Sequence, residues 1–257
     1  MADRRGARFL VAQGARPAGS DRRALLRLAL GAAALLVAYL VLARQLPRLS
    51  LRPSLLVSLV VCLVFISLLC VGLLPLRRMG HRILLVAALA VALGIVFTAL
   101  GWVFLADPAK VVFAAALGFW LAEQITGPAI VAGIALLAAV ADIVSVAVGP
   151  TKALLAHAPG AIGYFTLAFA WPGRDPASVY TALGVSDVIF FCLYLCSARR
   201  FRLRTAATVV GMALSVVISV VIGLQISAVP ALPLMGVAFV GVNADLLWRG
   251  GRSARGA

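Results

Sequence analysis

Two aspartates lie inside apolar segments, where a carboxylate is costly to place. Asp142 stands in "LLAAVADIVSVAVGP" and Asp187 in "TALGVSDVIFFCLYL". The other carboxylates fall in tails, in predicted loops, as Asp107 does, or near the ends of apolar segments. A carboxylate inside a bilayer costs on the order of several kcal/mol, so it is a candidate for function. The structural alternative is an interhelical hydrogen bond that only holds helices together.

Asp142 and Asp187 are predicted to lie at one depth below the same membrane surface. Asp142 comes seven residues before the end of its segment at Gly149, and Asp187 seven residues after the start of the next segment near Tyr180. Because neighbouring segments run antiparallel, a rise of 1.5 Å per residue places both carboxylates roughly 10 Å below that surface. Two facing carboxylates share a proton, since both cannot ionise cheaply side by side. One can then act as base on a water molecule while the other, protonated, polarises a scissile carbonyl.

A broken helix entrance is predicted on the same side of the membrane. Pro230 and Pro233 open the last apolar segment in "QISAVPALPLMGVAF". Proline has no amide donor and keeps the preceding residue extended. The carbonyls that this break leaves free must line a cavity or meet another chain, because lipid offers them no partner.

The elements that position these groups are predicted to be membrane helices. Apolar residues make up 64% of the 257 residues and charged residues 12%, and the mean hydropathy is +1.11. In a soluble domain about a quarter of all residues are charged, so this sequence indicates an integral membrane protein in a lipid bilayer. The net charge of +15 gathers in tails and connecting segments, which the positive-inside rule explains better than nucleic-acid binding, and we expect no nucleic-acid partner.

The cysteines and histidines do not indicate a metal site. All four cysteines lie within apolar runs, their spacing does not match a zinc site, and the chain has only two histidines. We therefore expect the cysteines to pack between helices as small apolar residues, with no metal and no cofactor.

The hydropathy pattern predicts an all-α, polytopic bundle of about eight (8–9) transmembrane helices. Apolar windows can be drawn at residues 28–43, 54–76, 83–105, 109–122, 127–149, 180–198, 205–224 and 228–248. The segment 155–171 is too short and too interrupted to span a membrane. Within it, we expect Tyr164–Trp171 to form a strand or a re-entrant piece.

The distribution of basic residues predicts that both termini are cytoplasmic. With eight spans, seventeen Lys and Arg residues lie on the inner side and six on the outer side. Counting the segment 155–171 as a ninth span would move the four arginines of 199–204 to the outer side, which the positive-inside rule disfavours. Three arginines on the outer side, at 44–52, are an exception to the rule. We expect the chain to divide into a basic cytoplasmic tail (1–27), an N-terminal transmembrane bundle (28–122), a catalytic transmembrane core (127–248) and a basic C-terminal tail (249–257). We expect a multi-pass protein of a bacterial cytoplasmic membrane.

The two aspartates and the proline entrance together resemble the intramembrane aspartic proteases of the presenilin and signal-peptide-peptidase type. That family carries a Tyr-Asp motif in one span, a Gly-x-Gly-Asp motif in the next and a Pro-Ala-Leu motif at the start of its last span. The matching residues here are Asp142, then Gly184 and Asp187 in "GVSD", then Pro230, Ala231 and Leu232 in "VPALPLM". The resemblance covers roughly residues 127–245, in the family's order. Ala141 replaces the tyrosine of the first motif and Ser186 the second glycine of the second motif.

The resemblance implies a presenilin-like fold and an aspartic endopeptidase that cleaves within transmembrane segments. In such an enzyme Asp142 and Asp187 activate water, while Gly184, Ser186 and the Pro-Ala-Leu residues shape the site and hold substrate. The predicted orientation is that of signal peptide peptidase, which implies transmembrane or signal-peptide-like substrates with a cytoplasmic N-terminus.

A helical substrate must unwind before its peptide bonds become accessible. Its freed backbone groups then need partners in lipid, and strand addition supplies them. Tyr164–Trp171 is a candidate for the receiving strand, and an interfacial aromatic belt is the alternative explanation of this segment.

Two other functions are compatible with the sequence. A proton- or cation-coupled transporter can use intramembrane carboxylates and broken helices, although the two halves of the chain show no inverted repeat. In a catalytically inactive membrane scaffold, Gly127, Gly133 and Gly211 would serve helix packing alone. The sequence does not indicate the oligomeric state.

Overall fold

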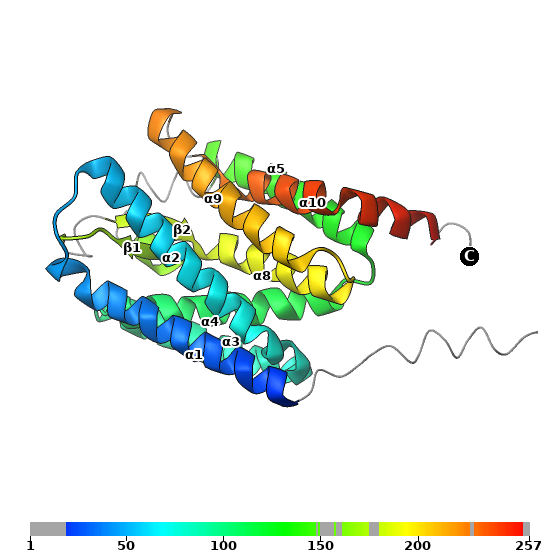
Figure 1. Cartoon of the computed structure of the whole chain (residues 1–257), viewed down its shortest axis with the longest axis horizontal. Coiled ribbons are helices and arrows are strands. Elements are labelled where there is room, and N and C mark those ends of the chain that lie inside the picture. Colours follow the sequence, from blue (N-terminus) through cyan, green and yellow to red (C-terminus); the bar gives the residue numbers. More distant parts are fainter. Residues whose placement is uncertain are drawn as a thin grey trace, which may run out of the picture.

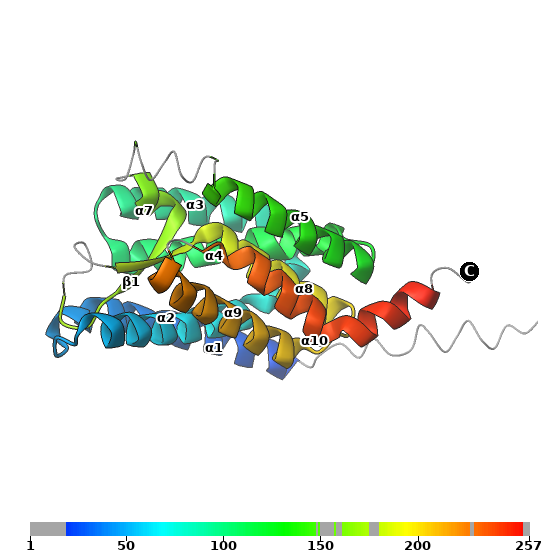
Figure 2. The same cartoon turned by 90° about the horizontal axis from the view of Figure 1, so that it is seen from above.

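The computed structural model describes residues 19–147, 149, 157, 161–174, 180–226 and 229–253. Over these residues the chain is an elongated bundle of helices with one two-stranded hairpin at one end (Figures 1 and 2). The long helices are α1 (Gly19–Leu42), α2 (Leu51–Leu73), α3 (Ile83–Ala99), α4 (Val103–Gln124), α5 (Pro128–Ala147), α8 (Val185–Arg200), α9 (Thr205–Ile226) and α10 (Ala231–Ser253). The short elements are η2 (Ala43–Gln45), η3 (Leu74–Arg82), α7 (Ile162–Phe165), β1 (Thr166–Ala170) and β2 (Tyr180–Gly184).

Every predicted apolar window overlaps a long helix, and the window 83–105 covers α3 and also reaches the first residues of α4. Five helical stretches of the described chain are long and apolar enough to cross a membrane: Arg22–Gln45, Leu51–Ala99, Val103–Gln124, Pro128–Val146 and Thr205–Gly223. The second of these contains both α2 and α3, joined through η3. Helix α8, with 16 residues, and the apolar part of α10, Ala231–Leu247, are shorter than these five stretches. The helices are therefore compatible with a membrane bundle, while the number of spans stays a prediction.

The outer surface of the bundle is apolar. Leu30, Leu85 and Val237 each leave more than two thirds of their area exposed, at 72%, 72% and 71%. A large exposed apolar surface is destabilising in water and is what a lipid-facing helix presents. The exposed side chains thus support the membrane assignment independently of the hydropathy of the sequence.

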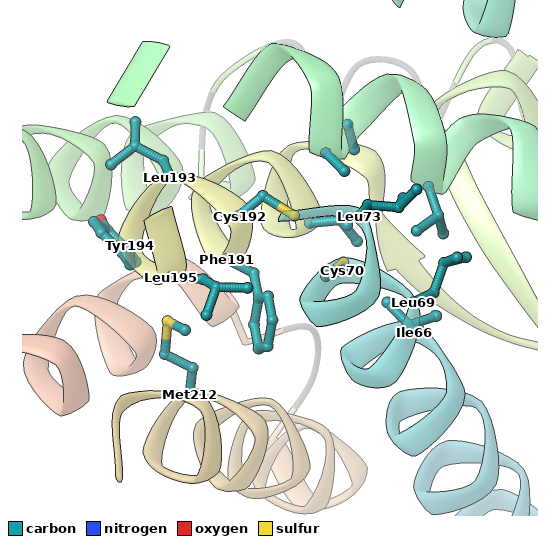
Figure 3. Packing of buried hydrophobic residues seen from close by; sticks show 14 of the residues in the cluster. Ile66, Leu69, Cys70, Leu73, Phe191, Cys192, Leu193, Tyr194, Leu195 and Met212 are labelled. Atoms are coloured by element: carbon teal, nitrogen blue, oxygen red, sulfur yellow. The ribbon is translucent and has the colours of Figure 1, made fainter. Parts of the chain in front are cut away.

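Helix α8 lies at the centre of the bundle. It packs against α4 and α9, and its residues from Phe191 to Ala198 are all buried. A helix that is apolar on all sides belongs in the interior. Figure 3 shows its side chains between α2 and α9, and Tyr194 stacks on Phe239 of α10 with ring centroids 4.9 Å apart. All four cysteines are free and buried, which confirms their predicted packing role.

The hairpin adds a small sheet to the predicted all-α bundle. β1 lies inside the segment Tyr164–Trp171, so the prediction of a strand there is confirmed for its central residues. The prediction that a helix starts near Tyr180 is wrong, because residues 180–184 form β2 and α8 begins only at Val185. The strands pair antiparallel from Thr166↔Gly184 to Ala170↔Tyr180. This pairing satisfies backbone groups that a free helix end would leave without partners.

Candidate active site

Asp142 reaches from α5 to the beginning of α10. Its Oδ2 accepts a hydrogen bond from the Leu232 N–H at 3.1 Å, and its side chain is partly exposed. The first amides of a helix have no intrahelical acceptor and carry the positive end of the helix dipole. A carboxylate from a neighbouring helix therefore stabilises the entrance of α10, and it brings Asp142 together with the Pro-Ala-Leu segment.

The proline entrance of α10 is held by hydroxyls from α9. In a regular helix Val229 O would accept from the amide at position 233, but Pro233 has none. Instead Ser219 Oγ donates to Val229 O at 2.8 Å, and Ser215 Oγ donates to Leu234 O at 3.1 Å. The prediction that a carbonyl freed by the proline break lines a cavity or meets another chain is wrong for Val229 O, which is bonded within the chain. Two serines spaced four residues apart on α9 were the sequence feature that could have identified the partners of these carbonyls.

Asp187 lies in the first turn of α8, directly after β2. Its Oδ2 accepts a hydrogen bond from the Gly184 N–H at 3.2 Å, the contact that an acidic residue makes at the third position of a helix. A Cβ on Gly184 would lie 3.0 Å from this oxygen and 3.1 Å from Ser186 Oγ. Glycine at this position leaves space for the Asp187 carboxylate, and Ser186 is exposed.

Both aspartates lie near the first turns of α10: Asp142 binds the Leu232 N–H, and Asp187 borders a cavity together with Met235, one turn further along α10. Helices α5, α8 and α10 contact one another, so the bundle gathers Asp142, Asp187 and the Pro-Ala-Leu segment at one end. Leu232 is buried there, while Pro230 and Ala231 are partly exposed. Ala141, which replaces the tyrosine of the family motif, is exposed on α5.

A small cavity borders Asp187 and involves the first half of the chain. It is lined by Leu63, Ile66, Ser67, Leu183, Asp187, Val188, Phe191, Val216 and Met235. Most of these side chains are apolar, so the Asp187 carboxylate stands at the edge of a water-poor region. In such surroundings electrostatic interactions are stronger than in water.

Asp107 and Lys110 form a buried pair that the sequence prediction missed. Asp107 was assigned to a loop, but α4 starts at Val103 and continues through Pro108, so that both residues lie inside the helix. Lys110 Nζ is 3.5 Å from Asp107 Oδ1, and the two residues are only 7% and 3% exposed. The helical spacing of three residues between opposite charges was the available clue.

The outer edge of β1, which faces away from β2, is occupied by side chains from α1 and α4. Lys110 Nζ donates to Thr166 O at 3.0 Å, and the Ala168 N–H donates to Asp107 Oδ2 at 2.9 Å. At the far end, Tyr39 Oη donates to Ala170 O at 2.9 Å. β1 therefore has no room on this edge for another strand.

The turn of the hairpin is bound by the connection between α1 and α2. Gly173 N–H donates to Ala43 O at 2.7 Å, and Arg48 Nε donates to Gly173 O at 3.2 Å. Arg48 is one of the three arginines that contradicted the positive-inside rule. Its hydrogen bond to the hairpin gives a structural reason for an arginine at this position.

Comparisons of the chain with protein-family models, with curated proteins and with solved structures found no match.

Proposed function

We propose that the chain is an aspartic endopeptidase that hydrolyses peptide bonds within transmembrane segments, with Asp142 and Asp187 as its catalytic pair. The observation that carries the proposal is the position of the two aspartates at the start of α10: Asp142 on α5 binds the Leu232 N–H, and Asp187 on α8 borders a cavity with Met235 of α10. Two carboxylates in one low-polarity site favour a state in which they share a single proton. That state supplies both the base and the acid that amide hydrolysis requires.

The reaction follows from the shared proton. The ionised aspartate removes a proton from water as the water oxygen attacks the scissile carbonyl carbon, while the protonated aspartate donates to the carbonyl oxygen. Collapse of the tetrahedral intermediate breaks the C–N bond, and the leaving nitrogen takes up a proton from the pair. The hydrogen bonds from Gly184 and Leu232 hold one oxygen of each carboxylate, so the pair is positioned before substrate arrives.

We assign the substrate strand to the edge of the hairpin formed by β2. The sequence analysis favoured the segment containing β1, but the outer edge of β1 is occupied by Tyr39, Asp107 and Lys110. Since Ala168 donates away from β2, its partner Ala182 also directs its N–H and C=O away from β1. An unwound substrate added to this edge of β2 would run past Gly184 toward Asp187.

The orientation of the protein is part of the proposal. We propose a multi-pass protein with both termini in the cytoplasm and the hairpin near the opposite surface, as the distribution of basic residues indicates. Substrates would then be transmembrane or signal-peptide-like helices that enter with a cytoplasmic N-terminus.

Cleavage of a model membrane helix by the purified protein in detergent tests the proposed activity. We expect Asp142→Asn and Asp187→Asn each to lower the rate by at least about 100-fold, because each variant removes one member of the acid–base pair. Asp245→Asn is the matched control, since Asp245 pairs with Arg204 on the exposed part of α10. Failure of the wild type to cleave any of a set of helices, or aspartate-dependent ion uptake without cleavage, would contradict the protease and favour a transporter.

A further inference from the structure

The Asp107–Lys110 pair is fully bonded within the protein. Lys110 Nζ uses its three hydrogens on Gly163 O at 2.6 Å, Thr166 O at 3.0 Å and Asp107 Oδ1 at 3.5 Å. The other Asp107 oxygen accepts from the Ala168 N–H. Burying two charges costs more free energy than burying two apolar side chains of similar size, so stability alone does not explain the pair.

What the pair adds is a defined position for β1. Its contacts with Thr166 O and Ala168 N–H are two residues apart, which is the spacing of groups that face one edge of a strand. A shift of β1 by one residue would turn both groups away from α4 and leave the buried Asp107–Lys110 pair without these two backbone partners. The register of β1 against α4 is therefore strongly specified.

The same contacts lead directly to Asp187. Thr166, whose carbonyl accepts from Lys110, is paired with Gly184 across the hairpin. The amide of Gly184 donates to Asp187 Oδ2. Because β1 is held in place, the paired strand β2 is held in place as well. β2 in turn determines the position of the Asp187 carboxylate and of the strand edge that runs toward Asp187.

We propose that Asp107 and Lys110 are positioning residues, which hold the hairpin in one register relative to Asp187 and so determine which substrate peptide bond is cleaved. This inference rests on the proposed function, because it assigns the choice of bond to the hairpin of the same site. Neither residue touches the reacting atoms. The first half of the chain, through α4, thereby contributes to specificity.

The double variant Asp107→Asn/Lys110→Met tests the proposal. It removes both charges together and avoids the unpaired buried charge that either single substitution would leave. We expect amide hydrogen exchange in residues 166–170 to rise at least tenfold, and the cleavage products of one model helix to spread over neighbouring peptide bonds by mass spectrometry. Glu123→Gln is the matched control, because Glu123 pairs with Arg200 at the other end of the same helix.

The outcomes separate the two proposals. A folded double variant with unchanged product masses would overturn the positioning role, whether or not exchange rises. A wild type that cleaves nothing would overturn the proposed function, while the exchange measurement would still report whether the pair holds β1. If the double variant does not fold, Tyr39→Phe removes one hydroxyl from the same edge of β1. That variant is expected to broaden the product masses to a smaller degree, and unchanged masses would count against the proposal.

Discussion

Each of the two aspartates binds an amide at the beginning of a helix. Asp187 Oδ2 accepts from Gly184 and Asp142 Oδ2 from Leu232, so both carboxylates have one oxygen fixed by backbone. Such contacts alone would make the residues helix caps, each worth about 1 kcal/mol. A purely structural role does not explain why two carboxylates stand near the start of the same helix, α10, since neighbouring like charges destabilise a fold.

Gly184→Ala should impair catalysis while leaving the fold intact. The new Cβ would lie 3.0 Å from Asp187 Oδ2, so the carboxylate must move by a few tenths of an ångström. We expect kcat for cleavage of a model helix to fall roughly tenfold with a small change in KM, because misplacement of a catalytic group acts on the transition state. Gly31→Ala is the control, since nothing lies within 4 Å of a Cβ there. An unchanged kcat would mean that Asp187 is not in its working position in this structure.

At the scale of elements, α8 connects the core of the bundle to the site. Its first turn carries Asp187, and its later residues are buried among α2, α4 and α9 (Figure 3). Close approach to α4 depends on Gly118, where a Cβ would collide with Ile189 O and lie 2.9 Å from Cys192 Cβ. Both contacts involve α8, so the packing of α4 constrains the helix that positions Asp187.

Gly118→Ala should therefore destabilise the protein, whereas Gly133→Ala should not. Both substitutions replace a glycine within a helix, and alanine is intrinsically favoured there by about 0.5–1 kcal/mol. A Cβ at Gly133 meets nothing within 4 Å, so this variant should keep or raise the melting temperature in detergent. Overpacking at Gly118 should lower the free energy of unfolding by about 1–3 kcal/mol and thereby lower the melting temperature. Equal melting temperatures for the two variants would show that α4 and α8 are less closely packed than the structure indicates.

At the scale of the whole molecule, the two halves of the chain meet at the hairpin. Helices α5, α8 and α10 carry the candidate site, while α1, α4 and the connection between α1 and α2 bind β1 and the hairpin turn. Helices α1 and α4 and the connection between α1 and α2 thus help to determine where the hairpin lies.

Reporter fusions in cells test the predicted orientation. A reporter that is active only in the cytoplasm should be active when it is fused to the C-terminus or inserted in the connection 199–204. The arginines in these segments keep them on the inner side. A third reporter inserted between α1 and α2, after Gln45, should behave as external. Finding either of the first two outside would overturn the orientation and, with it, the expectation of substrates with a cytoplasmic N-terminus.

The sequence by itself determined the helices and the three unusual features. Long apolar runs leave helix formation as the way to satisfy the backbone in lipid, so each predicted window corresponds to a helix. Carboxylates at Asp142 and Asp187 and prolines at Pro230 and Pro233 stand out in such runs, because every polar or amide-free residue there needs a specific partner.

Only the tertiary structure decided how these features are connected. Strand β2 was predicted as helix because its residues are apolar, and only pairing with β1 makes them extended. Asp107 was assigned to a loop because a charge interrupts a window of apolar residues. In the folded protein it pairs with Lys110, and the pair is bonded to residues 53 to 61 positions away in the chain. The partners of Val229 O and Leu232 N–H likewise lie on other helices. Hydropathy and local spacing report neighbours along the chain, and the site is built from contacts between distant segments.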